Sequence, residues 1–242
     1  DAGSYTVLIT SSQGGLMSAA AVVTIGPPAP GRLINISVRT QAGNAAQTLI
    51  MGFAVNGGGK NLLVRGIGPE LIQYDVTGTL TDPLLTVFNS AKAAILSNDN
   101  WGDGGTSASN ALSTAFASVG AFPLSDTASK DAALVASLNP GQYTAQITDV
   151  SGGTGVALAE VYDLDGTSAA GRLANISTRA QVGTGADILI AGFVVSAGDP
   201  KQLLIRGIGP ALLQYGATRV LHDPVLTIFN SSGSAIQTND NW

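Results

Sequence analysis

The chain has 242 residues, 45% hydrophobic and only 11% charged, with a formal net charge of −5. High hydrophobicity with low net charge excludes a disordered chain, and the lack of a basic stripe argues against a nucleic-acid partner. Cysteine is absent, which excludes disulfides and thiolate sites. No apolar run approaches about 20 residues, the length of a transmembrane helix, so we expect no membrane insertion.

Short segments bounded by Gly, Pro, Asn and Asp dominate the chain and predict strands. The alternating segment 33–39 is typical of a half-buried strand, whereas the continuous apolar runs at 48–55 and 188–195 predict strands buried on both faces. In the remainder of residues 1–165 we expect strands at 5–10, 19–25, 62–65, 84–89, 93–97, 132–137, 143–148 and 156–163.

Two segments predict short connector helices. Pro69 begins about one turn at 69–74, and 107–119 carries Leu112, Phe116 and Val119 at helical spacing behind Ser or Thr caps. Many short strands with turns at this spacing favour an all-β, antiparallel β-sandwich of immunoglobulin-like or jelly-roll-like type. Because aromatic residues are only 5% of the chain, we expect Tyr5, Phe88, Trp101 and Tyr143 to be largely buried.

The chain also repeats itself. GRLINISVRTQAG at 31–43 returns as GRLANISTRAQVG at 171–183, and residues 31–101 as a whole recur at 171–242 with one inserted residue. AGSYTVLIT at 2–10 likewise resembles PGQYTAQIT at 140–148. Fixed-period self-similarity marks tandem repeats of a structural unit. We therefore expect the C-terminal hairpin of a preceding domain at 1–27, a complete repeat at 31–165, and the first half of a second copy at 171–242.

These boundaries have two interpretations. The chain is a segment of a longer tandem polypeptide, or it is a subunit that neighbouring subunits complete. The half-domain leaves apolar strands at 187–195 and 203–206 without their closing sheet, and residues 1–25 carry a closing hairpin without a sheet. Contact between the two parts is heterologous and propagates an open filament. If the chain is a whole subunit, we expect strands near 5–10 or 19–25 to add to the half-domain of a neighbouring chain by β-augmentation. In a longer polypeptide the same junction is covalent, and the neighbour is the next repeat.

Two resemblances sharpen the expectation. DAGSYTV at 1–7 resembles strand F of immunoglobulin-like domains, with Tyr5 as the corner tyrosine and Val7 in place of the disulfide cysteine. The motifs R-x-x-N-I-S-x-R, L-I-x-G-F, L-x-R-G-I-G-P, D-P-x-L-T-x-F-N and N-D-N-W, across 31–242, are similar to repeats of very large bacterial surface or secreted proteins. The resemblance implies a structural or adhesive role outside the cell and no catalytic activity.

Two loops have the composition of candidate ligand sites. NDNWGDG at 98–104 offers oxygens of Asp99, Asn100 and Asp103 that suit calcium, but the spacing is not that of an EF-hand, and Asn and Asp equally build turns. RGIGP at 65–69 lacks the third glycine of a dinucleotide site. We favour structural turns for both, with no metal or cofactor assigned.

Charged residues recur in register between the copies and have two interpretations. In one interpretation they line a groove that binds carbohydrate or carboxylate. In the other, which we favour, they form Arg–Asp pairs that stabilise the structure. Catalysis has little to draw on, because the one histidine, His222, is Thr81 in the complete copy. We therefore expect no enzyme and no catalytic residues. The recurring residues are Arg39, Arg65, Arg179, Arg206, Asp82, Asp99, Asp223 and Asp240.

These observations favour a structural, extracellular or cell-surface protein that forms a fibre, filament or stalk by head-to-tail association of β-sandwich repeats. The alternative is an adhesion module that binds a polysaccharide or a cell surface through its Gly-rich and Asn-rich loops.

Overall fold

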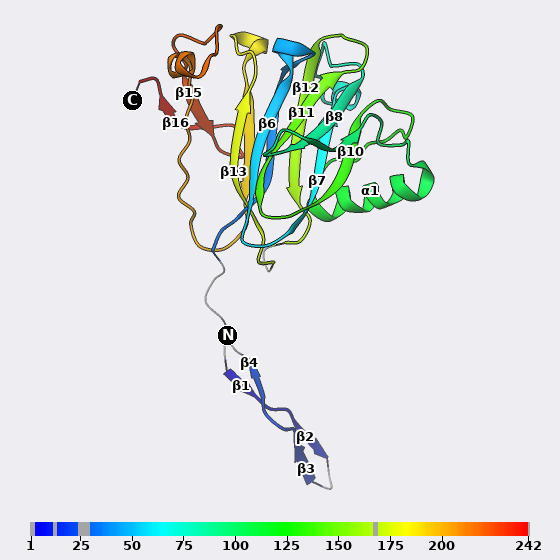
Figure 1. The fold of residues 1–242 in the computed structure, drawn as a ribbon. Coiled ribbons are helices and arrows are strands. Elements are labelled where there is room, and N and C mark those ends of the chain that lie inside the picture. Colours follow the sequence, from blue (N-terminus) through cyan, green and yellow to red (C-terminus); the bar gives the residue numbers. More distant parts are fainter. Residues whose placement is uncertain (1–2, 12–13, 24–29, 167–168, 242) are drawn as a thin grey trace.

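The computed structural model describes residues 3–11, 14–23, 30–166 and 169–241 (Figure 1). The protein is all-β and antiparallel, as predicted, with one α-helix among the described residues. The first part of the chain forms β1 (Gly3–Tyr5), β2 (Leu8–Ser11), β3 (Gly14–Met17), β4 (Ala21–Val23), β5 (Leu33–Ala42), η1 (Ala45–Gln47), β6 (Leu49–Asn56), β7 (Lys60–Ile67), η2 (Pro69–Tyr74), β8 (Pro83–Asn89) and β9 (Ala94–Asn98). The remainder forms α1 (Gly105–Val119), β10 (Ala132–Leu138), β11 (Gly141–Asp149), β12 (Gly155–Asp163), β13 (Arg172–Arg179), η3 (Gly185–Asp187), β14 (Ile190–Val195), η4 (Pro210–Tyr215), β15 (Leu226–Phe229) and β16 (Ala235–Asn239).

One large antiparallel sheet of ten strands dominates the molecule and curls into a nearly closed barrel. Its strand order is β10-β7-β12-β5-β13-β6-β11-β8-β9, and β14 pairs with β5. The edge strands β9 and β10 approach each other, and the Asn98 side chain joins them by accepting the Ala133 N–H at 2.9 Å. A side chain therefore bridges the sheet where main-chain pairing stops.

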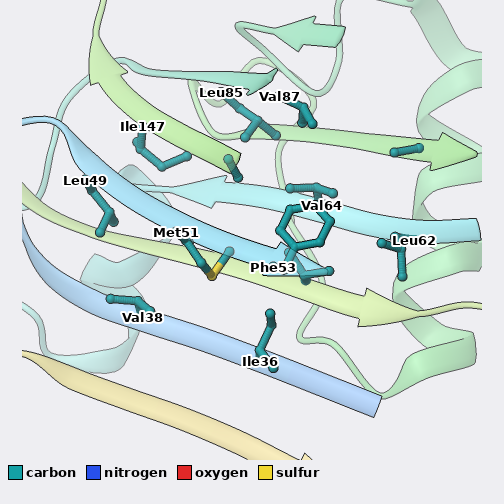
Figure 2. Close-up of a cluster of buried hydrophobic side chains, with 14 of the residues drawn as sticks. Ile36, Val38, Leu49, Met51, Phe53, Leu62, Val64, Leu85, Val87 and Ile147 are labelled. Atoms are coloured by element: carbon teal, nitrogen blue, oxygen red, sulfur yellow. The ribbon is translucent and has the colours of Figure 1, made fainter. Parts of the chain in front are cut away.

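The barrel interior is filled by alternate side chains from its strands. In β6 and β8, and in β5 from Ile36 onward, burial alternates from residue to residue, which is the period of a pleated strand. Figure 2 shows Ile36, Val38, Met51, Phe53 and Val64 among the side chains that converge between the strands. Burial of such side chains contributes roughly 1.5–3 kcal/mol each and is the main stabilising contribution to the fold.

A second apolar cluster lies outside the barrel, where α1 covers the sheet. Phe116 packs against Trp101 with ring centroids 5.9 Å apart, so Trp101 is a buried core residue, as we expected. The helix confirms the prediction at 107–119, but Gly104 precedes it and no side chain caps it. Because apolar layers cover both sides, β7 is buried on both faces. The prediction of burial on both faces at 48–55 and 188–195 was wrong, because β6 is fully buried only on its interior face and no residue of β14 is fully buried.

The second copy reproduces the local structure of the first but not all of its strands. The 3-10 turns η2 and η4 correspond, and so do the hairpins β8–β9 and β15–β16, whose register shifts fall at Phe88 and at its counterpart Phe229. The strand expected at 203–206 was wrong, because residues 201–207, the counterpart of most of β7, form no strand. In the first copy β7 lies between β10 and β12, whereas residues 201–207 have no such strands beside them among the described residues. Turns thus depend on local sequence, whereas this strand depends on its neighbours.

The strands β13 and β14 of the second copy pair with the first copy rather than with each other. β13 pairs with β6 and β14 with β5 over most of their lengths. The prediction that 187–195 needs a neighbouring strand is therefore met from within the chain.

The N-terminal segment forms a narrow ribbon away from the barrel, with β1 paired to β4 and β2 to β3 (Figure 1). Its counterparts in the complete copy, β11 and β12, lie apart in the sheet, where β11 pairs with β6 and β8 and β12 with β5 and β7. The ribbon leaves Tyr5, Ile9 and Leu16 exposed. Our expectation that Tyr5 is buried was wrong, because its ring lies over Gly3 without a sheet above it.

Candidate functional site

The RGIGP loop that follows β7 is shaped by its main chain. A Cβ on Gly68 would lie 2.2 Å from the Leu80 carbonyl oxygen, so this close approach admits only glycine. The N–H groups that could hold a phosphate already donate to Asp131, from Gly68 at 2.7 Å and from Glu70 at 3.1 Å. The fully buried Asp131 carboxylate thus caps η2. A strand-ending turn, as we favoured, accounts for the motif.

Arg65 is fully buried in β7 and pairs with Glu160, which lies opposite it on β12. Its Nε donates to Glu160 Oε2 at 2.8 Å and Nη1 donates to the Phe122 carbonyl at 2.7 Å, while Nη2 forms the ion pair with Glu160. The guanidinium lies 4.2 Å from the Phe122 ring centroid and 5.0 Å from that of Phe116. Arginine therefore has the structural role that we favoured, but its partner is a glutamate.

Tyr162 completes this buried group by donating its hydroxyl to Glu160 Oε1 at 2.8 Å. Burial and the adjacent Glu160 charge raise the pKa of Tyr162 far above its ordinary value. The hydroxyl therefore stays protonated and works as a hydrogen-bond donor, which stabilises the Glu160 carboxylate.

Among the recurring arginines, Arg39 lies at the edge of a cavity. It lines a shallow cavity of about 350 Å³ with Ser37, Tyr74, Phe122 and Ile190, the last from the second copy. Among the described residues no carboxylate oxygen lies within salt-bridge distance of Arg39. The rings of Tyr74 and Phe122 lie 5.0 Å apart at one side. The Arg39 guanidinium can bind a carboxylate, and the neighbouring aromatic rings can pack against the face of a sugar ring.

The NDNW turn works chiefly as a junction between strands. Asn98 holds β10, as described above, and the Trp101 indole donates to the Asp126 carbonyl at 3.0 Å. The Asn100 amide donates to Asp99 at 3.3 Å and to Asp103 at 3.0 Å. In the second copy Asn239 and Asn241 repeat the local bonds, while Trp242 lies outside the described residues.

The calcium interpretation depends on buried side-chain oxygens, in or near this turn, that accept no hydrogen bond. Asp82 Oδ1, Asp99 Oδ1 and Asn100 Oδ1 are buried without a hydrogen-bond partner. Burial, together with the charges of Asp82 and Asp103, raises the pKa of Asp99. Even so, no described group of three or more His, Cys, Asp or Glu is placed to hold a metal ion.

The recurring charged residues of the second copy lie at the surface. Arg179 and Arg206 are exposed, as are His222 and the acidic residues Asp223 and Asp240. None of them forms an ion pair with another described residue. Asp82 lies 3.9 Å from the half-exposed Lys130, which is a weak surface pair. The recurrence of these charges therefore does not bring them together.

Sequence analysis missed a buried ion pair at the start of β7. Lys60 Nζ lies 2.7 Å from Asp163 Oδ1 and donates to the Gly166 carbonyl at 3.3 Å. Burial favours the neutral form of Asp165, but hydrogen bonds from Asn61 and the Lys60 charge outweigh this effect and lower its pKa. These contacts anchor the segment that leads to the second copy. Lys60 and Asp163 are brought together only by the nonlocal pairing of β7 with β12, so no local sequence motif predicts the pair.

Comparison with known proteins found no matching family model, curated protein or solved structure. No helix in the described part of the chain has the length and apolar character needed to cross a membrane.

Proposed function

We propose that the chain is a structural, extracellular protein whose β-rich repeats associate into a fibre, filament or cell-surface stalk, without enzymatic activity. The observation that supports association between repeats is the pairing between copies, in which β13 adds to β6 and β14 adds to β5; growth beyond such a pair depends on the N-terminal ribbon. Main-chain ladders of this kind join units through hydrogen bonds that do not depend on charge. The low charge content and the absence of cysteine are consistent with this role.

Head-to-tail growth in this proposal uses the N-terminal ribbon. Its strands expose Leu8, Ile9 and Leu16, and this apolar surface favours addition to another sheet. The ribbon corresponds to β11 and β12, which in the complete copy lie beside the counterparts of β14, β15 and β13. The second copy of a neighbouring chain is therefore its natural acceptor.

Assembly of the purified chain tests the proposal. Light scattering with size-exclusion chromatography, followed by negative-stain electron microscopy, should show concentration-dependent linear polymers. Ile9→Ser, in the ribbon, should reduce polymer mass, whereas Val150→Ser, at an exposed turn of the barrel, should not. A monomer at all concentrations, or equal effects of the two variants, would count against the proposal.

The second candidate function is adhesion through the cavity beside Arg39. Its support is the combination of a cation without a described ion-pair partner and the Tyr74–Phe122 ring pair. A glycan and uronate array should show saturable binding that Arg39→Ala abolishes and Arg179→Ala, its exposed counterpart, leaves unchanged. A pure scaffold shows no saturable binding with either variant.

A further inference from the structure

The strands β5 and β6 are consecutive and antiparallel, yet no ladder joins them. β5 pairs with β12 on one edge and with β14 on the other. β6 pairs with β11 on one edge and with β13 on the other. The two edges that would meet in an ordinary hairpin are occupied by the two corresponding strands of the second copy.

The two contacts between copies have the same register. Ile176 lies opposite Phe53, and Ile36 lies opposite Phe193. Ile176 is the counterpart of Ile36, and Phe193 is the counterpart of Phe53. The register shift also recurs, between Leu173 and Asn175 in one contact and opposite their counterparts Leu33 and Asn35 in the other. The interface is therefore two-fold symmetric in its residue pairing, as in an isologous dimer.

Side-chain fit follows the same symmetry. A Cβ on Gly52 would lie 2.5 Å from Ser177 Oγ, and a Cβ on Gly192 would lie 2.6 Å from Ser37 Oγ. Each glycine leaves room for the serine hydroxyl opposite, so the L-I-x-G-F and N-I-S motifs are complementary surfaces. Any copy of the repeat carries both, and the fit specifies register as well as attraction.

The same complementarity exists within a single copy. Pairing Ile36 with Phe53 in this register places Ser37 opposite Gly52 and Thr40 opposite Leu49, which leaves the connection at 41–48 as the turn. β5 and β6, which pair with strands of the second copy, therefore carry the residues needed to pair with each other inside the first copy. This relationship is that of a domain swap, in which one set of contacts forms within or between units.

We infer that the facing edges of β5 and β6 are an exchange surface whose partner is the same strand pair from a second copy of the repeat. A copy without a partner closes by pairing β5 with β6, and a copy with a partner opens and takes β13 and β14. The inference deepens the self-association part of the proposed function. Because an isologous contact uses both edges at once, it joins copies in pairs, and growth beyond a pair needs a different surface, such as the ribbon.

Disulfide trapping in the full chain tests the exchange, since the protein has no cysteine of its own. The Cβ built on Gly52 lies 3.9 Å from Ser177 Cβ, within the range of about 3.5–4.5 Å that a disulfide spans. Gly52→Cys with Ser177→Cys should lose both free thiols on mild oxidation of the folded protein. Ser37→Cys with Gly52→Cys reports the closed form and should keep its thiols, because β14 separates the strands.

A third variant forces the closed form. Ile176→Pro with Phe193→Pro removes donors from β13 and β14 and prevents their docking. In this background the Ser37→Cys and Gly52→Cys pair should oxidise. Hydrogen-exchange protection of β7 and β12 verifies that the barrel is folded in each variant.

The inference is overturned if the Gly52–Ser177 pair stays reduced, or if the Ser37–Gly52 pair oxidises equally with and without the prolines. It is also overturned if that pair stays reduced with the prolines in a folded barrel. These thiol measurements do not depend on polymer formation, so failure of the proposed fibre would leave them interpretable.

Discussion

Arg65 and Glu160 lie opposite each other on β7 and β12, and both side chains are buried beneath α1. The pair holds two strands together from the outer face of the barrel. Two rings that stack on the guanidinium, and a tyrosine that donates to the carboxylate, satisfy groups that burial would otherwise leave without partners. Removal of either charge from this buried pair should therefore lower the free energy of unfolding more than removal of a surface charge.

Glu160→Gln should destabilise the protein by about 3–5 kcal/mol, because it leaves the buried Arg65 charge without its counterion. Urea denaturation of the full chain, followed by circular dichroism, measures this loss. The matched control is Lys130→Met, which removes the weak surface pair with Asp82 and should cost about 0–1 kcal/mol. Equal losses in the two variants would contradict a structural role for the buried pair.

Gly68→Ala should cost about 1–3 kcal/mol, because its Cβ meets the Leu80 carbonyl oxygen and the main chain must move. Gly59→Ala is the control, since the nearest atom to its Cβ is 3.6 Å away. Thermal unfolding compares the two. If Gly68→Ala is neutral while phosphate or a dinucleotide stabilises the wild-type chain, the loop is a ligand site after all.

Asp99→Asn should stabilise the protein near neutral pH. The pKa of Asp99 is raised above 3.8 in the folded chain by burial and by Asp82 and Asp103. The folded state therefore becomes less stable relative to the unfolded state as the pH rises from about 3.8 through the folded pKa. The gain in Tm from Asp99→Asn should be present at about pH 7 and vanish at about pH 3.

The control for this prediction is Asp240→Asn, at the exposed counterpart of Asp99, which should leave Tm unchanged. Titration with calcium separates the two interpretations of the turn. A calcium-dependent rise in the Tm of the wild-type chain, absent in Asp99→Asn, would contradict a purely structural turn.

Local features were the ones that the sequence predicted well. Proline at the first position of η2, the apolar spacing of α1 and the alternation of β5 depend on neighbouring residues, and all three appear where they were expected. The burial of Trp101 followed from its rarity and type, and its place in the second cluster agrees.

Nonlocal features were not predicted. The pairing of β13 with β6 joins segments about 120 residues apart, and that of β14 with β5 joins segments about 160 residues apart. No window of sequence reveals such pairings. The same limit applies to Lys60 and Arg65, whose acidic partners come from β12 and the segment after it. The recurring aspartates suggested Arg–Asp pairs, but recurrence marks positions that share a local role, such as the Asp99 and Asp240 turns.

The last prediction concerns residues 201–207, which carry nearly the sequence of β7 but form no strand. Because β7 lies between β10 and β12, we expect the second segment to become a strand once those partners are supplied. A chain extended after Trp242 by a second copy of residues 102–165 provides them. Amide hydrogen exchange at 203–207 should slow markedly in the extended chain, towards the protection of β7. Exchange at β15, which already pairs with β16, serves as the internal reference. Unchanged exchange at 203–207 in a folded extended chain would show that the second copy does not complete the same sheet.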